Sequence, residues 1–314
     1  MKNTAEAAKK PIIIYDTDMD TDCDDVGALA ILCEYVRAGR AELLGVVADA
    51  PVADAAPCCE AILRHYGVDV PVGATYPNAY PAERLATCHR HRALLAPARY
   101  YNRPLAERVG KCAYDYPRAD RLYRELLSRA EDGSVTVAVV GFPTALADLL
   151  ADREDRALFA RKVLCVVSMT NVGYPEQTAP NFNYDTEAVG TRAFLATCPV
   201  PIFASREGVD IITGSHLTDA LPADHPLRLS YELYMEGERR GRASWDLVAA
   251  LFALEPTSPL FSVTYYPGEQ IDYEADPCRL FWRAGDRGDA VIKTTLPPEE
   301  MAEILNRRML GDLE

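Results

Sequence analysis

One stretch near the N-terminus decides the fold: Ile12-Ile13-Ile14-Tyr15-Asp16-Thr17-Asp18-Met19-Asp20-Thr21-Asp22-Cys23-Asp24-Asp25. Its apolar run predicts a buried strand, and this strand leads directly into six carboxylates. At an effective dielectric near 20, two carboxylates roughly 4 Å apart repel each other by about 4 kcal/mol. A divalent cation with oxygen ligands would offset this repulsion. The stretch therefore predicts a metal site at the end of the first strand.

Apolar runs and helical segments alternate along the rest of the chain. Strands are expected at 11–16, 42–48, 135–140, 162–168 and 200–204. Their apolar residues are continuous, which indicates strands that are covered on both faces, as in a parallel sheet. Helices are expected at 25–38, 53–66, 118–130, 143–152 and 184–196. This order predicts a doubly wound, mostly parallel α/β fold, in which ligands bind beyond the carboxyl ends of the strands.

The chain is long enough to bury a sizeable core, and we expect one domain over residues 1–314. Its core should cover about 11–256, and a small β appendage about 257–314, because 257–293 shows short strands and turns. The segment 75–117 is irregular and contains a basic cluster at 88–92. A loop of this length is typical of a functional lid or an oligomer contact.

The composition limits the partners that we expect. A net charge of −14 argues against non-specific binding to nucleic acid or to an anionic membrane. Residues 1–10 lack an apolar signal core, and no stretch is long and apolar enough to span a membrane. The nine cysteines have no zinc spacing, which favours reduced thiols. We therefore expect a cytoplasmic protein that binds neither nucleic acid nor membranes.

Two known acidic motifs fit the first stretch poorly. Asp16-x-Asp18-x-Asp20 has the spacing of an EF-hand, but Thr21 and Gly27 stand where that loop needs Gly and Glu. A haloacid-dehalogenase-like phosphatase also begins with Asp-x-Asp after a strand. In that alternative Asp16 would be the nucleophile and Asp18 the acid/base. Two residues after the second Asp that family has Thr or Val, whereas this chain has Asp20.

The stretch resembles more closely the signature of the nucleoside hydrolase family, a strand followed by Asp-x-Asp-Pro-Gly-x-Asp-Asp and a helix, here with two extra loop residues. Three later segments resemble family motifs in the same order. They are Val139-Val140-Gly141-Phe142-Pro143-Thr144, Asn181-Phe182-Asn183-Tyr184-Asp185-Thr186-Glu187-Ala188 and Ser244-Trp245-Asp246. The order of these three segments makes the resemblance fairly specific, and it covers about residues 11–255.

The resemblance implies a role for each matching residue. The ligands of one Ca²⁺ would be the carboxylates of Asp18, Asp25 and Asp246 and the carbonyl of Val140. Asp18 would also accept the proton of the attacking water. Ribose hydroxyls would be bound by Asp24, Asn181 and Asn183.

Met169 and Trp245 each allow two interpretations. Met169 either packs near the sugar or belongs to the core. Trp245 occupies a position where many members have a proton-donating His and a purine-preferring branch has a stacking Trp, so it either contacts the leaving base or packs in the core.

Some residues depart from the family pattern. Asn181 replaces a ribose-binding Glu, and Thr170-Asn171 replaces a Gly-Gly. Asp16, Asp20 and Asp22 are either hydrogen-bonding partners of the site or solvated loop acids, and the solvated interpretation is favoured for Asp20 and Asp22.

The expected activity is Ca²⁺-dependent N-glycosidic hydrolysis of nucleosides, with a purine preference suggested by Trp245. The alternatives are a phosphatase and a non-catalytic protein that binds ribose or nucleosides with a metal. The resemblance also implies a homodimer or homotetramer.

Overall fold

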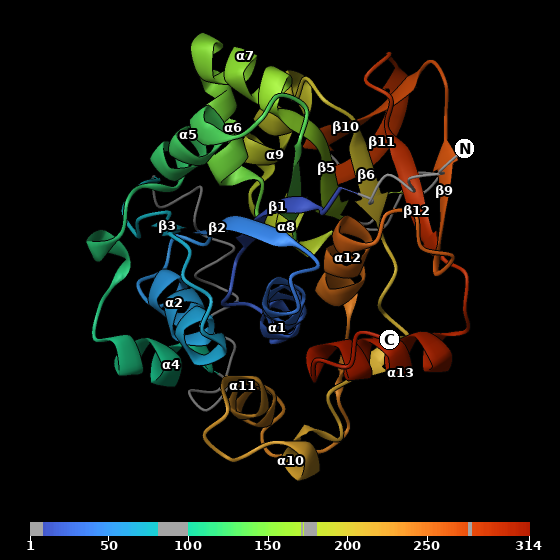
Figure 1. The fold of residues 1–314 in the computed structure, drawn as a ribbon. Helices are drawn as coiled ribbons and strands as arrows, with labels where there is room; N and C mark the ends of the chain where they lie inside the picture. Colours follow the sequence, from blue (N-terminus) through green and yellow to red (C-terminus); the bar gives the residue numbers. More distant parts are fainter. Residues whose placement is uncertain (1–8, 81–99, 171, 173–180, 276–277) are drawn as a thin grey trace, which may run out of the picture.

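An eight-stranded sheet forms the centre of the computed structural model, which describes residues 9–80, 100–170, 172, 181–275 and 278–314 (Figure 1). The strand order is β3-β2-β1-β4-β5-β6-β12-β9. Neighbouring strands are parallel except for β9, which pairs antiparallel with β12 at the edge. The strands are β1 (Ile12–Thr17), β2 (Glu42–Ala48), β3 (Val72–Ala74), β4 (Val135–Val139), β5 (Val163–Met169), β6 (Ile202–Ser205), β9 (Phe261–Tyr265) and β12 (Ala290–Thr294).

Helices cover both faces of this sheet. Helices α1, α2 and α12 pack on one face, and α5, α6 and α9 on the other (Figure 1). The helices are α1 (Asp24–Arg37), α2 (Ala55–Tyr66), α4 (Asn102–Val109), α5 (Ala119–Arg129), α6 (Thr144–Ala151), α7 (Arg153–Lys162), α8 (Phe182–Thr186), α9 (Ala188–Thr197), α10 (Leu217–Ala220), α11 (Pro226–Tyr234), α12 (Trp245–Leu254) and α13 (Pro298–Met309). A short 3₁₀ helix covers Ala113–Asp115. The mostly parallel α/β fold is confirmed.

Strand β1 shows why its apolar run is continuous. Ile13 and Tyr15 face the layer of α1 and α12, whereas Ile14 faces the layer of α5 and α6. All three side chains are fully buried. Because both faces of the strand are covered, neither face needs polar residues.

One expected helix is divided in the structure, and one helix was not expected. The segment 184–196 is divided into α8 and α9 because Glu187 caps the second helix, its carboxylate accepting a hydrogen bond from the backbone N–H of Gly190 at 2.7 Å. Helix α7 was not expected. Asp152 caps it by accepting from the N–H groups of Glu154 and Asp155 at 2.8 and 3.0 Å.

The C-terminal region contains the expected small antiparallel sheet and also extends the central one. Strands β10 (Glu269–Ala275) and β11 (Cys278–Ala284) form a hairpin that packs against α9. Strands β9 and β12 instead complete the central sheet, and α13 returns to contact α1. The division into a core and an appendage at about residue 256 stays a prediction.

The acidic stretch lies where the strand order reverses direction. Strands β1 and β4 are neighbours, and the chain turns outward from them to β2 and β3 on one side and to β5 and β6 on the other. Ligands of doubly wound folds bind at this switch point. No described helix combines the length and apolar character that a bilayer span needs. The basic cluster 88–92 lies outside the described residues.

Candidate active site

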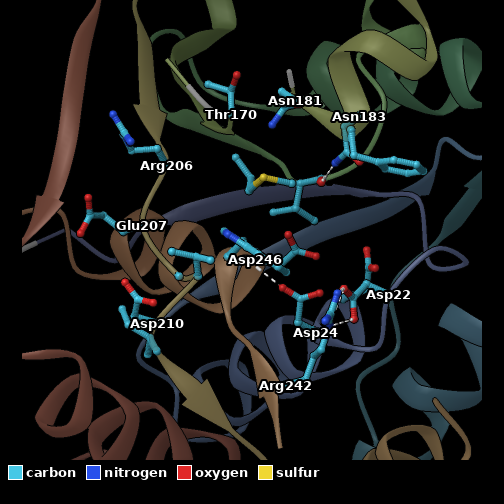
Figure 2. A pocket seen from close by; sticks show the side chains of 18 of the residues that line it. Asp22, Asp24, Thr170, Asn181, Asn183, Arg206, Glu207, Asp210, Arg242 and Asp246 are labelled. Atoms are coloured by element: carbon cyan, nitrogen blue, oxygen red, sulfur yellow. Dashed lines mark hydrogen bonds and ion pairs between the residues drawn. The ribbon is translucent and has the colours of Figure 1, made fainter. Parts of the chain in front are cut away.

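A cavity of about 1080 Å³ opens at the carboxyl ends of the central strands. Its lining comes from five regions: the loop after β1, the ends of β4 and β5 with the start of α8, residues 206–211, residues 234–246 and the end of β12. Figure 2 shows Asp22, Asp24 and Asp246 on one side of this pocket, with Thr170 and Asn181 on another. Segments far apart in the chain therefore meet in one place.

Three aspartates form the centre of the acidic side. Single carboxylate oxygens of Asp24, Asp25 and Asp246 lie within 4.8 Å of one another, and all three residues are buried. Asp24 Oδ2 accepts from the backbone N–H of Asp246 at 3.1 Å (Figure 2). In the described part of the chain, no N–H or O–H group donates to Asp25 Oδ2, which is buried. This orphaned oxygen within a carboxylate cluster fits a hard divalent cation.

Burial makes the charged forms of these acids costly. It is the largest cause that raises the pKa of Asp25 and Asp246 well above the ordinary value, and the next cause is the charge of Asp18 for Asp25 and of Asp24 for Asp246. The pKa of Asp24 is likewise raised by burial and then by Asp22. A bound cation would reverse these shifts, because it stabilises the ionised form.

Asp18 lies against this cluster. Burial raises the pKa of Asp18 to about 7, and its carboxyl lies next to that of Asp25. Its Oδ2 accepts from Thr21 Oγ1 at 2.6 Å. The following residue, Met19, has a φ of 41°, an uncommon value for a residue with a side chain, and its N–H donates to Asp25 Oδ1 at 3.2 Å. The loop is thus bent so that Asp18 and Asp25 share one site.

The preference for solvated Asp20 and Asp22 was wrong. Asp20 is only 3% exposed and accepts a hydrogen bond from Asn102 Nδ2 at 2.8 Å. Asp22 forms an ion pair with Arg242, whose Nε lies 2.8 Å from Asp22 Oδ2. Both acids therefore fix the loop to other elements, Asp20 to α4 and Asp22 to β8 (Arg242–Ala243).

Arg242 also contacts two aromatic rings of the pocket. Its guanidinium carbon lies 5.2 Å from the ring centre of Trp245 and 5.4 Å from that of Tyr234. Trp245 is half-buried and lines the cavity, so it is not simply a core residue. The ion pair with Asp22 fixes Arg242, and Arg242 in turn supports the Trp245 ring.

A close backbone contact fixes the position of Trp245. Gly208 has a φ of +133°, and a Cβ there would lie 2.5 Å from both the N and the Cα of Trp245. The N–H of Ser244 donates to the Gly208 carbonyl at 3.0 Å. Only glycine allows the 206–211 segment to approach the start of α12 so closely.

Amide side chains line the side formed by α8. Asn183 Nδ2 donates to the carbonyl of Val140, so this carbonyl already has one partner (Figure 2). Asn181 Oδ1 caps α8 by accepting from the N–H of Tyr184 at 3.0 Å. Among the described residues, none forms a hydrogen bond with Asn181 Nδ2 or Asn183 Oδ1, so both atoms could bind a polar ligand. Met169 is half-buried and lines the same cavity.

Asp49, which the sequence reasoning missed, forms a second buried acidic pair with Asp16. Asp49 follows β2 and is fully buried, as is Asp16. Burial raises the pKa of Asp49 well above its ordinary value and that of Asp16 to about 6, and the charge of Asp16 raises the pKa of Asp49 further. Asp16 also accepts from Tyr123 and does not line the cavity, which contradicts its role as a phosphatase nucleophile.

Solved structures of nucleoside hydrolases share this architecture. The inosine-uridine preferring nucleoside hydrolase from Bacillus anthracis is 15% identical, with a TM-score of 0.65 over 96% of this chain and 100% of that one. An inosine-guanosine nucleoside hydrolase is 16% identical, with a TM-score of 0.65 over 97% and 100%. The type III effector XopQ, solved with adenosine diphosphate ribose, is 17% identical, with a TM-score of 0.70 over 97% and 93%.

The chain has the nucleoside hydrolase fold. No protein-family model and no curated protein matches the sequence.

The nucleoside hydrolase fold brings together all the site residues that the sequence suggested. The cavity is lined by Asp18, Asp24, Asp25, Val140, Met169, Asn181, Asn183, Trp245 and Asp246. It is also lined by residues that the sequence reasoning missed, among them Tyr234, Arg242, Arg206 and Lys293. Of these, only Arg242 carried a signal, as a basic residue just before the Trp-Asp pair. Asn171, which replaces a family glycine, lies outside the described residues.

Proposed function

We propose that the protein is a Ca²⁺-dependent N-glycosidase that hydrolyses ribonucleosides to ribose and a free base. The observation that carries the proposal is the convergence of Asp18, Asp24 and Asp25 with Asp246, more than 200 residues away in sequence, in one buried cluster beside two asparagines and a tryptophan. This set combines a cation site, hydroxyl-binding groups and an aromatic surface for a base.

The donor set fits a hard cation. Carboxylates of Asp18, Asp25 and Asp246 would hold Ca²⁺ together with the carbonyl of Val140, and Asp24, whose oxygen belongs to the same cluster, is a further ligand candidate. When bound, Ca²⁺ would orient a water molecule and lower its pKa.

The chain's own groups would do the remaining work. Asp18 would accept the proton of the attacking water, whose oxygen bonds to C1′ of the ribose while the bond between C1′ and the base nitrogen breaks. Asp24, Asn181 and Asn183 would bind the ribose hydroxyls. The electron pair of the broken bond between C1′ and the base nitrogen leaves with the base, which must take up a proton.

Trp245 would face the leaving base, and Arg242 would support its ring. An indole ring offers a flat surface for a purine, and the guanidinium behind it holds the ring in place. We therefore propose a preference for purine nucleosides.

A nucleoside panel tests the activity. Inosine, guanosine, adenosine, uridine and cytidine are incubated with the full chain, and released ribose is measured as reducing sugar with Ca²⁺ or with EDTA. We expect ribose release in Ca²⁺, larger for the purines, and at least a hundredfold less in EDTA.

Other outcomes would contradict the proposal. Ribose or nucleoside binding without turnover would identify a non-catalytic binding protein, an alternative that the Asn181 replacement motivates. Equal rates for purines and pyrimidines would remove the base preference. The homodimer or homotetramer stays a prediction, checked by light scattering of the purified chain.

A further inference from the structure

Two cations line the wall of the cavity away from the acidic cluster. Arg206 follows β6 directly, and Lys293 lies on the neighbouring strand β12. Ser205 and Ile292, the residues just before them, are paired in the parallel register and fully buried. Arg206 and Lys293 are both exposed. Neighbouring strands lie about 4.8 Å apart. Arg206 and Lys293 therefore place two positive charges side by side at the carboxyl ends of β6 and β12.

Neither cation forms an ion pair or a side-chain hydrogen bond within the described residues, whereas Arg242, on another wall, is bound to Asp22. Two acids share the wall with them. Glu207 accepts from Thr294 Oγ1 at 3.1 Å, and Asp210 is exposed. Figure 2 shows Arg206 on the side of Thr170, and Asp210 on the side away from Thr170. Arg206 and Lys293 line the pocket without an ion-pair partner among the described residues, so their charges are open to an anionic part of a ligand.

The position of the cations relative to the rest of the site limits which part of the ligand is anionic. On the proposed function, on which this step rests, the ribose diol faces the carboxylate cluster and the base faces Trp245. The remaining substituent of the ribose is C5′. Arg206 lies next to Thr170, whose N–H donates to the Ser205 carbonyl at 2.8 Å, and so borders the side of the asparagines rather than that of Asp22.

We propose that Arg206 and Lys293 bind a phosphate on C5′, which makes ribonucleoside 5′-monophosphates the preferred substrate class. Hydrolysis then yields ribose 5-phosphate and a free base, and the phosphate ester stays intact. A cavity of about 1080 Å³ exceeds what a nucleoside alone fills. Arginine and lysine are the usual side chains for phosphate recognition.

Calorimetric titration tests this subsite without turnover. Ribose, ribose 5-phosphate and inorganic phosphate are titrated into the full chain in Ca²⁺ at low salt. We expect ribose 5-phosphate to bind at least tenfold more tightly than ribose. This ratio should fall at least fivefold in Arg206→Gln and in Lys293→Gln, and it should keep its wild-type value in Arg192→Gln, an exposed arginine on α9 that does not line the cavity.

The outcomes separate the two proposals. Equal binding of ribose and ribose 5-phosphate would overturn the phosphate subsite and leave the nucleoside hydrolase proposal standing. Binding of neither sugar would overturn both. A preference for ribose 5-phosphate that persists in both variants, or that falls equally in Arg192→Gln, would show that general charge and not this wall is responsible. Inorganic phosphate that competes with ribose 5-phosphate in the wild-type chain, but not in the Arg206→Gln and Lys293→Gln variants, would directly support the phosphate subsite.

Discussion

At the scale of a single residue, the buried carboxylate of Asp18 lowers stability but is needed for the proposed chemistry. The residue is 2% exposed, and the charges of Asp20 and Asp22 raise the cost of its ionised form further. A residue of this kind persists where its chemistry is needed, because a neutral side chain of the same shape would fold more easily. Met19 stores further strain beside it, with a positive φ in a residue that carries a side chain.

We expect Asp18→Asn to separate the two effects. Without its proton acceptor, the variant should lose about 10²–10⁴-fold in kcat for purine nucleosides. Without a buried charge, its free energy of unfolding in EDTA should rise by about 1 kcal/mol. Steady-state assays and urea unfolding measure both quantities. The control is Asp219→Asn, a solvent-exposed acid, and near-normal turnover of Asp18→Asn would refute the assigned role.

At the scale of elements, the site depends on how α12 and the 206–211 segment meet. Helix α12 packs on α1, and this contact brings Asp246 to Asp24 and Asp25. The backbone of Gly208 lies against the first residue of the same helix. A small change in this contact should therefore move Trp245 and Asp246 together.

Gly208→Ala tests this dependence. The new Cβ would meet the backbone of Trp245 at 2.5 Å, so we expect at least a tenfold loss of affinity for purine nucleosides and a shift of the tryptophan fluorescence. Gly67→Ala is a matched control: Gly67 also has a positive φ, +68°, but no atom lies within 4 Å of its added Cβ. It should cost about 1–2 kcal/mol of stability and leave ligand affinity unchanged. Equal effects on affinity would show that backbone strain alone is responsible.

At the scale of the whole molecule, the buried acids link stability to pH and to cations. Because burial raises the pKa of Asp18 to about 7, the folded state keeps a proton that the unfolded state releases near pH 4. This contribution stabilises the fold below the unfolded pKa and is lost as the pH rises through about 7. Burial lowers the pKa of His225 to about 4, below its ordinary value of 6.5. Above pH 6.5 this residue is neutral in both the folded and the unfolded state, so it no longer changes the stability with pH.

We therefore expect the Tm in EDTA to fall between pH 6.5 and 8.5, and the increase in Tm caused by Ca²⁺ to grow over the same range, since the cation needs ionised ligands. Thermal unfolding followed by circular dichroism, with Mg²⁺ as a second cation, measures both trends. A Tm in EDTA that rises over this range, or a Ca²⁺ effect that shrinks, would contradict the account.

The sequence predicted the features that depend on local pattern. The continuous apolar strands gave the parallel sheet, and the acids after β1 together with the Trp-Asp pair indicated residues that the fold brings to one pocket. It did not predict which side chains of distant segments pair, or which strands of the C-terminal region join the central sheet. The Asp22–Arg242 pair joins residues 220 positions apart, and β12 reaches β6 only in the assembled sheet. For this reason Lys293 and Arg206 could not be placed in the site beforehand.

The central claim is that one cation joins the aspartates to a ribose. A crystal structure of the protein soaked with Ca²⁺ and ribose tests it most directly. The account predicts an anomalous peak about 2.3–2.6 Å from oxygens of Asp25 and Asp246, with two ribose hydroxyls in the same coordination shell. Ribose bound elsewhere, or no ion between these two carboxylates at saturating Ca²⁺, would contradict it.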